Sequence, residues 1–197
     1  SSEKIIGRWL RDRGYHDEVV LLTKVSSGGS PENIKRAVAA SLEHLGTDRI
    51  DIYMMHSPDP KTPLKETLHA MTEEVRSGRI RTLGYSNCDS DLLEEAHELN
   101  KTEGYSRIES AEPPLNLAIK PEQYRLFSFC QEKNVATIAY SPLAAGFLTG
   151  KYSPSTEAIP KGTRFDVIPG HIDVYFSDRN FKIVERLKAL SERAGKS

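Results

Sequence analysis

A lysine and a histidine, two side chains that can transfer protons, each stand at the end of a short apolar stretch. Side chains in an extended chain alternate between two faces, so Lys24 ends one row of Val19–Val25 and His56 ends one row of Ile50–His56. If both rows face the interior of one sheet or barrel, the ammonium and the imidazole meet at its rim, partly removed from water. The pattern therefore predicts a proton-transfer site where these two stretches end.

Both residues also fit simpler interpretations. Lys24 is consistent with an exposed lysine at a strand end, and His56 with a hydrogen-bonded turn residue ahead of Pro58. The other histidines fall on expected helix faces or loops: His16, His44, His69, His97 and His171. The residue pattern alone leaves the catalytic and the structural interpretations open.

The spacing of other candidate motifs argues against several other kinds of site. Gly84–Cys88 is close to the hydrolase elbow G-x-S-x-G but ends in cysteine, and Ala145–Tyr152 lacks the first glycine and the final Ser/Thr of a phosphate loop. No G-x-G-x-x-G follows an expected strand, and no His, Cys and carboxylate group has metal-ligand spacing. We therefore expect neither a Rossmann site nor a metal site.

Cys88 and Cys130 form no CxxC pair and fit free thiols in a reducing compartment, the cytoplasm.

Strands and helices are predicted to alternate along the chain. The expected strands are apolar and rich in β-branched residues: Val19–Val25, Ile50–His56, Ile80–Ser86, Ile108–Ala111 and Val135–Ser141. The expected helices are residues 1–10, Pro31–Leu45, Pro63–Ser77, Asp91–Asn100, Pro121–Lys133 and Phe181–Ala194. Ser30 and Thr62 are predicted N-caps, and Gly46 and Gly78 are predicted to end helices with positive φ. This alternation predicts the α/β class, with a parallel sheet built from βαβ units.

The composition narrows the class of protein further. The 197 residues include 27 Lys+Arg and 28 Asp+Glu, a net charge of -1, which rules out a basic nucleic-acid arm. No stretch approaches the roughly 20 apolar residues of a membrane span, and the N-terminus lacks the pattern of a signal peptide. With no linker, one domain over residues 1–197 is expected. Ser153–Asp178, rich in Pro and Gly, is predicted to be a long loop of the kind that covers a site.

Taken in order, several segments resemble the aldo-keto reductase family along nearly the whole chain. They are Leu22–Val25, Ser41–Tyr53, His56–Asp59, Gly84–Asn87 and Ala139–Leu143. The resemblance implies an incomplete TIM-type (β/α)8 barrel with about five parallel strands present and the N-terminal and C-terminal barrel strands outside the chain. It also implies an NADPH-dependent oxidoreductase that reduces an aldehyde or a ketone by hydride transfer.

The resemblance assigns catalytic roles to the lysine and the histidine named first. Lys24 corresponds to the family's lysine, which activates a tyrosine, and His56 to the histidine that orients the substrate carbonyl. The family's tyrosine and aspartate would both precede Ser1. Tyr15 lies near the wrong end of a strand and Tyr53 lies below His56, so neither is a convincing substitute. The 197-residue chain itself is therefore expected to be inactive.

The resemblance also assigns residues to the cofactor NADP(H). Ser86 and Asn87 match the pair that hydrogen-bonds the nicotinamide carboxamide, and Tyr140 matches the aromatic residue stacked on the nicotinamide ring. Ser141 and Leu143 begin the loop that runs under the pyrophosphate. The resemblance thus implies that these cofactor ligands follow the expected strands Ile80–Ser86 and Val135–Ser141.

Glu112 departs from the family pattern, because a glutamine usually stands at this cofactor-binding position. A carboxylate there accepts a hydrogen bond from the carboxamide but cannot donate one.

Two rival hypotheses for the function remain: a non-catalytic relative with a cofactor-sensing or partner-binding role, and a truncated product without activity. The expected partner is a small-molecule carbonyl substrate, with no nucleic acid and no membrane. The particular substrate, the choice of NADP over NAD and the oligomeric state are left open.

Overall fold

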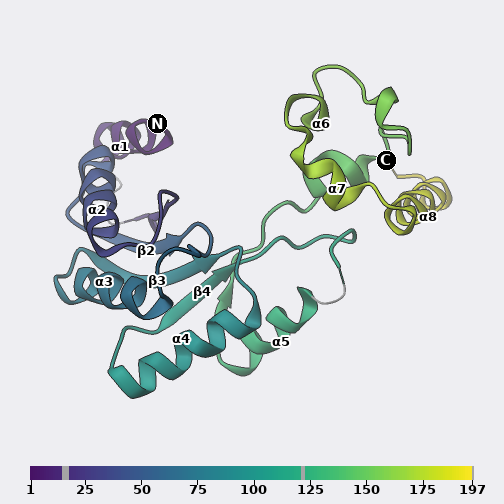
Figure 1. Cartoon of the computed structure of the whole chain (residues 1–197). Helices are drawn as coiled ribbons and strands as arrows, with labels where there is room; N and C mark the ends of the chain where they lie inside the picture. The colour runs from purple at the N-terminus through teal and green to yellow at the C-terminus, as the bar shows by residue number, and fades with distance from the viewer. Residues whose placement is uncertain (15–17, 121–122, 197) are drawn as a thin grey trace. The chain divides into compact units, whose positions relative to one another are not determined.

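A computed structural model describes residues 1–14, 18–120 and 123–196, which form two compact units. The first unit comprises Ser1–Pro113 and Tyr124–Ile138, and the second comprises Pro114–Gln123 and Ala139–Ser197. Figure 1 shows the strands with their long helices in the first unit and a set of mostly short helices in the second. The expected single domain over residues 1–197 stays a prediction.

The first unit contains a five-stranded sheet in which every neighbouring pair is parallel, in the order β1-β2-β3-β4-β5. The strands are β1 (Leu22–Val25), β2 (Ile50–Met55), β3 (Ile80–Ser86), β4 (Ile108–Glu112) and β5 (Ala136–Thr137). Neighbours in space are also neighbours in sequence, so each connection is a βαβ unit. The predicted α/β class and parallel sheet are confirmed. Within the described residues β1 and β5 each pair on one side, as in an incomplete barrel.

The strands are separated by helices that lie along one side of the sheet (Figure 1). These helices are α2 (Pro31–Leu45), α3 (Leu64–Arg76), α4 (Ser90–Glu103) and α5 (Tyr124–Glu132), and α1 (Ser2–Arg13) precedes β1. Between sheet and helices lies an apolar core that includes Tyr53, Met55, Leu83 and Tyr85. Side chains of the opposite parity, such as Met54, face the other side of the sheet.

The helix α1 is fixed to α2 and β1 by close packing and by one carboxylate. A methyl group at Gly7 would contact the carbonyl oxygen of His44 and lie 2.6 Å from that of Leu45, so only glycine allows this approach. Glu3 Oε1 accepts a hydrogen bond of 2.7 Å from Thr23 Oγ1, and its Oε2 lies 3.0 Å from His44 Nδ1. These contacts hold α1 beside the start of the sheet.

The helix ends follow the predicted signals with one exception. Ser30 is the N-cap of α2 and accepts a hydrogen bond from the amide of Asn33, while Gly46 ends the helix with φ of 69°. Gly78 has φ of 78°, one residue beyond the C-cap of α3. The prediction of Thr62 as an N-cap is wrong. Pro63 occupies that position, because the Thr62 hydroxyl donates instead to Asp59 Oδ2 at 2.8 Å.

The second unit is built around a cluster of aromatic rings. Its helices are η2 (Ala144–Thr149), η3 (Thr156–Ala158), α6 (Arg164–Val167), η4 (Pro169–His171), α7 (Ile172–Tyr175) and α8 (Asp178–Ala194). Phe147 is 1% exposed and its ring centroid lies 5.0 Å from that of Phe181 and 5.5 Å from that of Phe176. The expected loop Ser153–Asp178 therefore contains single helical turns, whose length is too short to give a periodic sequence pattern.

The observed strands at the two sheet edges are shorter than predicted. β1 begins at Leu22 rather than Val19, and Val20 is 70% exposed. β5 covers Ala136–Thr137, and beyond it an isolated bridge joins Tyr140 to Pro114.

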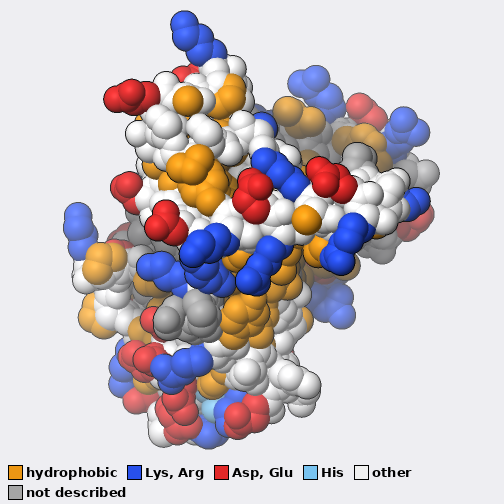
Figure 2. Space-filling model, turned by 90° about the vertical axis from the view of Figure 1, so that its right-hand side faces the viewer, with side chains coloured by type: hydrophobic (Ala, Val, Ile, Leu, Met, Phe, Trp, Pro, Cys, Tyr) orange, Lys and Arg blue, Asp and Glu red, His pale blue; other side chains and the backbone are white. Residues whose placement is uncertain are grey.

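Figure 2 shows one face of the molecule, on which apolar side chains lie exposed between charged ones. None of the described helices is both long and apolar enough to cross a membrane.

Candidate active site

Four consecutive strands of the first unit bring polar side chains to one edge of the sheet. Lys24 lies near the end of β1, His56 directly follows β2, Ser86 ends β3 with Asn87 behind it, and Glu112 ends β4. Because all four strands are parallel, these residues share the carboxyl edge, which is where βα barrels place their active sites.

An ion pair links the first and the fourth of these strands. Lys24 Nζ lies 2.8 Å from Glu112 Oε2, and the two side chains are 25% and 14% exposed. In a flat sheet β1 and β4 would be about 14 Å apart, three strand spacings, and two side chains that stand roughly perpendicular to the sheet would not meet across that distance. The contact therefore requires the sheet to curve, with Lys24 and Glu112 on its concave side.

A second set of hydrogen bonds ties the ends of β2, β3 and β4 together. Ser86 Oγ donates to the carbonyl oxygen of Glu112 at 3.0 Å. Asn87 Nδ2 donates to the carbonyl oxygen of His56 at 2.7 Å and to Ser86 Oγ at 3.2 Å. Asn87 also has φ of 52°, a left-handed conformation that asparagine tolerates better than most residues. The imidazole of His56 is exposed at this edge. Its backbone amide donates a hydrogen bond to the carbonyl oxygen of Val25, and its carbonyl oxygen accepts the one from Asn87.

Three neutral residues cover the concave side of the sheet below the ion pair. A methyl group at Gly84 would lie 2.6 Å from Ser110 Oγ and 2.7 Å from Met54 Cε, so glycine is needed for the close packing of these strands. Ser110 and Met54 are 3% and 0% exposed. The sequence pattern places Met54 in the row of β2 that ends at His56, but sequence reasoning missed Gly84 and Ser110, although each lies two residues before Ser86 or Glu112.

The tyrosines of β2 and β3 lie on the opposite side of the sheet. Tyr53 and Tyr85 are 0% and 2% exposed and belong to the core beneath the helices. Burial raises the pKa of Tyr53 strongly and that of Tyr85 to about 12. Neither phenol can serve as a proton donor beside Lys24, as predicted for Tyr53. Tyr15, the other candidate considered, lies outside the described residues.

The two cysteines are free thiols and neither is activated as a nucleophile. Cys130 is buried and Cys88 is half-buried. Burial raises the pKa of the Cys88 thiol to about 12 and also raises that of Cys130. Among the described residues, no group of three His, Cys, Asp or Glu side chains could hold a metal ion. The candidate site residues at the carboxyl edge stay those predicted from the sequence: a lysine, a histidine, an amide and a carboxylate.

The remaining predicted cofactor residues lie in the second unit. The Tyr140 carbonyl oxygen accepts a hydrogen bond of 3.0 Å from the amide of Leu115, and the Ser141 carbonyl oxygen accepts one of 3.0 Å from Asn116 Nδ2. Ser141 has φ of 54°, and Leu143 is 56% exposed. That these three residues share a cofactor site with Lys24 stays a prediction.

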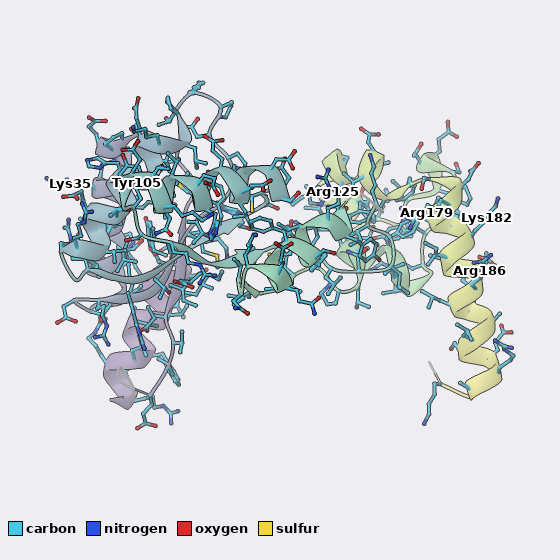
Figure 3. The ribbon with its side chains drawn as sticks, turned by 90° about the horizontal axis from the view of Figure 1, so that it is seen from below. Lys35, Tyr105, Arg125, Arg179, Lys182 and Arg186 are labelled. Carbon is cyan, nitrogen blue, oxygen red and sulfur yellow. The ribbon has the colours of Figure 1, made fainter. Side chains whose placement is uncertain are left out.

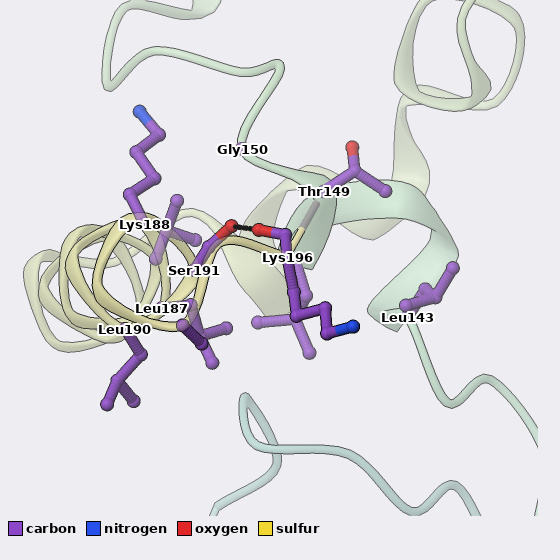
Figure 4. Close-up of a pocket in the computed structure, with 11 residues that line it drawn as sticks. Leu143, Thr149, Gly150, Leu187, Lys188, Leu190, Ser191 and Lys196 are labelled. Carbon is purple, nitrogen blue, oxygen red and sulfur yellow. Dashed lines mark hydrogen bonds between the residues drawn. The ribbon is translucent and has the colours of Figure 1, made fainter.

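Two other hollows occur in the second unit. One, of about 600 Å³, lies between η2 and α8 and is lined mainly by leucines and lysines, including Leu143, Leu187 and Lys188 (Figure 4). The other is a hollow on the surface of the first half of α8, and its lining includes Arg179, Lys182 and Arg186 (Figure 3). Neither combines an acid–base pair with a hydrogen-bonded amide, as the carboxyl edge of the sheet does.

A curved parallel sheet with helices on its outer side and acid–base groups at its carboxyl edge is the architecture of a βα-barrel protein. The sequence profile described as "Aldo/keto reductase family" matches residues 1–197. The chain therefore belongs to the aldo/keto reductase family, as its motifs predicted.

Individual relatives and a solved structure agree with this assignment. Aldo-keto reductase str7 of Strobilurus tenacellus is 34% identical over 201 residues, which cover 98% of this chain and 57% of that protein. Aldo-keto reductase yakc [NADP(+)] of Schizosaccharomyces pombe is 31% identical over 173 residues, covering 82% of this chain and 50% of that protein. The structure of the glycerol dehydrogenase AKR11B4 from Gluconobacter oxydans superposes with a TM-score of 0.76 at 26% identity, covering 100% of this chain and 61% of that one. The chain thus spans a little over half the length of these relatives.

Proposed function

We propose that this chain forms the central part of an oxidoreductase that reduces an aldehyde or a ketone with NADPH. The observation that carries the proposal is the gathering of Lys24, His56, Ser86, Asn87 and Glu112 at one edge of a curved parallel sheet. Membership of the aldo/keto reductase family supports the same class of reaction. The name of the yeast relative, which includes NADP(+), supports the choice of cofactor.

The side chains of the carboxyl edge suit a nicotinamide carboxamide. Ser86 and Asn87 offer a hydroxyl and an amide that are hydrogen-bonded to each other, and Ser86 is hydrogen-bonded to the backbone of Glu112, whose carboxylate lies against Lys24. A primary carboxamide has both donors and an acceptor to pair with such groups. We propose that these three residues hold the carboxamide and that Tyr140 contributes an aromatic face. Ser141 and Leu143 are proposed to support the pyrophosphate. The reduced nicotinamide, when bound, supplies the hydride.

Lys24 and His56 are proposed to act on the substrate oxygen. The Lys24 ammonium, held by Glu112 in partly desolvated surroundings, places a positive charge where negative charge develops as the carbonyl is reduced. The exposed His56 imidazole can donate a hydrogen bond that orients the carbonyl. We further propose that the 197-residue chain alone does not reduce carbonyls appreciably, because Tyr53 and Tyr85 are buried on the other side of the sheet and cannot donate a proton beside Lys24. The free thiols Cys88 and Cys130 support a cytoplasmic location.

The proposal is tested by comparing NADPH consumption by the 197-residue chain and by a version extended to the length of its relatives. Both are assayed with a panel of aldehydes and ketones, and with NADH in place of NADPH. The extended version should turn over with NADPH, and the shorter chain should be slower by about 10²-fold or more, the usual contribution of a general acid. Equal turnover by the two would contradict the role given to the missing acid. Cofactor binding without turnover by the extended version would favour the non-catalytic rival.

The role of the lysine is tested by Lys24→Met in the extended version, with Lys65→Met as the matched control. Lys65 also pairs with a glutamate, Glu103, at 2.7 Å, but on the outer surface of α3 and α4. Lys24→Met should abolish most of the activity, whereas Lys65→Met should leave it unchanged. An active Lys24→Met variant would refute the proposed mechanism.

A further inference from the structure

We propose that Glu112 is a positioning residue for Lys24, one whose carboxylate holds the lysine ammonium in its reactive place. The inference rests on the proposed function and adds a role to a residue that the family resemblance assigns only to the cofactor. It follows from the 2.8 Å contact between Lys24 Nζ and Glu112 Oε2 across the concave side of the sheet. A glutamine at this position would carry no charge to pair with the ammonium.

The backbone of Glu112 is held by hydrogen bonds, so its side chain starts from a fixed point at the end of β4. Its carbonyl oxygen accepts hydrogen bonds from Ser86 Oγ at 3.0 Å and from the Asn87 amide at 3.4 Å. Its side chain leaves the last position of β4, and Oε2 is shielded from solvent. The carboxylate therefore starts from a fixed backbone, and its charge restricts the ammonium at the end of the long Lys24 side chain, which is costly to order without a partner.

The surroundings of the pair make its charge more effective than that of a surface ion pair. Met54, Gly84 and Ser110, all neutral and buried, lie on the same side of the sheet. The side chains of Lys24 and Glu112 are 25% and 14% exposed, against 54% and 39% for Lys65 and Glu103. Screening by water is weaker at the less exposed pair, so loss of one partner there has the larger effect.

The first experiment measures how firmly Lys24 is held, and it needs no cofactor or turnover. The 197-residue chain and its Glu112→Gln variant are treated briefly with a lysine-acetylating reagent, and labelling at each lysine is followed by peptide mass spectrometry. Glu112→Gln should increase the labelling rate of Lys24 several-fold while leaving that of Lys65 unchanged. Glu103→Gln is the matched control and should release Lys65 alone. Unchanged labelling of Lys24 in Glu112→Gln would overturn the inference.

The second experiment is a double-mutant cycle in the extended version, with kcat and the KM for NADPH as readouts. Glu112→Gln should lower kcat by on the order of 10-fold, a coupling typical of neighbouring charged groups, with a smaller change in KM. In the Lys24→Met background the same substitution should lower kcat no further, because this part of its effect acts through the lysine, whereas any change in the KM for NADPH that comes from the proposed carboxamide contact should persist. Equal melting temperatures of the parent and Glu112→Gln show that folding is intact.

The outcomes separate the inference from the function on which it rests. Absence of NADPH consumption by the extended version would refute the proposed function, and full activity of Lys24→Met would overturn the role of the lysine and with it that of Glu112. Loss of activity in Lys24→Met together with full activity in Glu112→Gln would overturn only the role given to Glu112. An equal loss from Glu112→Gln in both backgrounds would also overturn it, because the carboxylate would then act on the cofactor or the fold rather than on the lysine. Glu112→Asp, which keeps the charge, should retain more activity than Glu112→Gln.

Discussion

Adding a single methyl group to β3 at Gly84 should lower the free energy of unfolding, because Gly84 packs closely against Met54 and Ser110 beside the candidate site. The methyl group would lie 2.6 Å from Ser110 Oγ and 2.7 Å from Met54 Cε, whereas ordinary contacts of this kind begin at 3.4 Å. The two side chains or the strands must therefore separate by about 0.7 to 0.8 Å. Overpacking of a well-packed interior costs about 1–3 kcal/mol of unfolding free energy. For a chain of this size that lowers the melting temperature by roughly 2–12 °C.

Thermal unfolding of Gly84→Ala, followed by circular dichroism, measures this loss. The matched control is Gly170→Ala, because a methyl group there would meet no atom within 4 Å, so its stability should change by less than about 1 kcal/mol. Ser110→Ala should recover part of the loss in Gly84→Ala, because it removes one of the crowded atoms. A Gly84→Ala variant that melts with the parent chain would show that the close packing of β2, β3 and β4 is wrong.

Three other perturbations test contacts within a single unit: two in the first unit and one in the second. Hydrogen bonds from Ser41, Thr23 and His44 outweigh burial and lower the pKa of Glu3, so the stability it contributes is complete above its ordinary value of 4.5 and is lost as the pH falls through the lowered value. The melting-temperature difference between the parent and Glu3→Gln should therefore shrink in acid, and a difference independent of pH would contradict the network. Backbone hydrogen bonds from Gly29 and Lys61 lower the pKa of Asp59, so Asp59→Ala should speed amide exchange at Gly29; unchanged exchange would show that Asp59 does not fasten the loop. Phe147→Ala should cost the second unit about 3–5 kcal/mol in denaturant unfolding, and a cost below about 1 kcal/mol would disprove the aromatic core.

Much of the first unit could be predicted from the sequence, because buried parallel strands and amphipathic helices differ clearly in their apolar spacing. β3 was predicted with its observed bounds, Ile80–Ser86, and α2 with Pro31–Leu45. The strand ends were less predictable at the edges of the sheet. β1 extends only where it pairs with β2, so Val20 is exposed although its residue type favours a strand.

Features that depend on tertiary contacts escaped prediction. Thr62 has the residue type of an N-cap, but its hydroxyl bonds to Asp59, which is brought close only by the folded loop. The single helical turns within Ser153–Asp178 are stabilised by aromatic contacts such as Phe165 with Phe176 at 5.3 Å, not by local periodicity. Neither has a signature in the local sequence.

The candidate site was predictable in its location but not in its internal pairing. Polar residues at the ends of parallel strands must share one edge, so Lys24, His56 and Asn87 could be placed together before any coordinates were known. The ion pair of Lys24 with Glu112 depends on the curvature of the sheet across two intervening strands. Sheet curvature is a property of the assembled fold, which explains why the pair was found only in the structure.

The central claim is that this edge of the sheet serves hydride transfer to a carbonyl carbon, and the fate of a labelled hydride tests it most directly. The extended version is incubated with an aldehyde and with NADPH deuterated at the nicotinamide carbon that gives up the hydride, and the product alcohol is examined by mass spectrometry and NMR. The proposed chemistry predicts one deuterium on the former carbonyl carbon for each cofactor consumed, and Lys24→Met should slow its appearance without moving it. An alcohol free of deuterium, or label released into water, would contradict the claim.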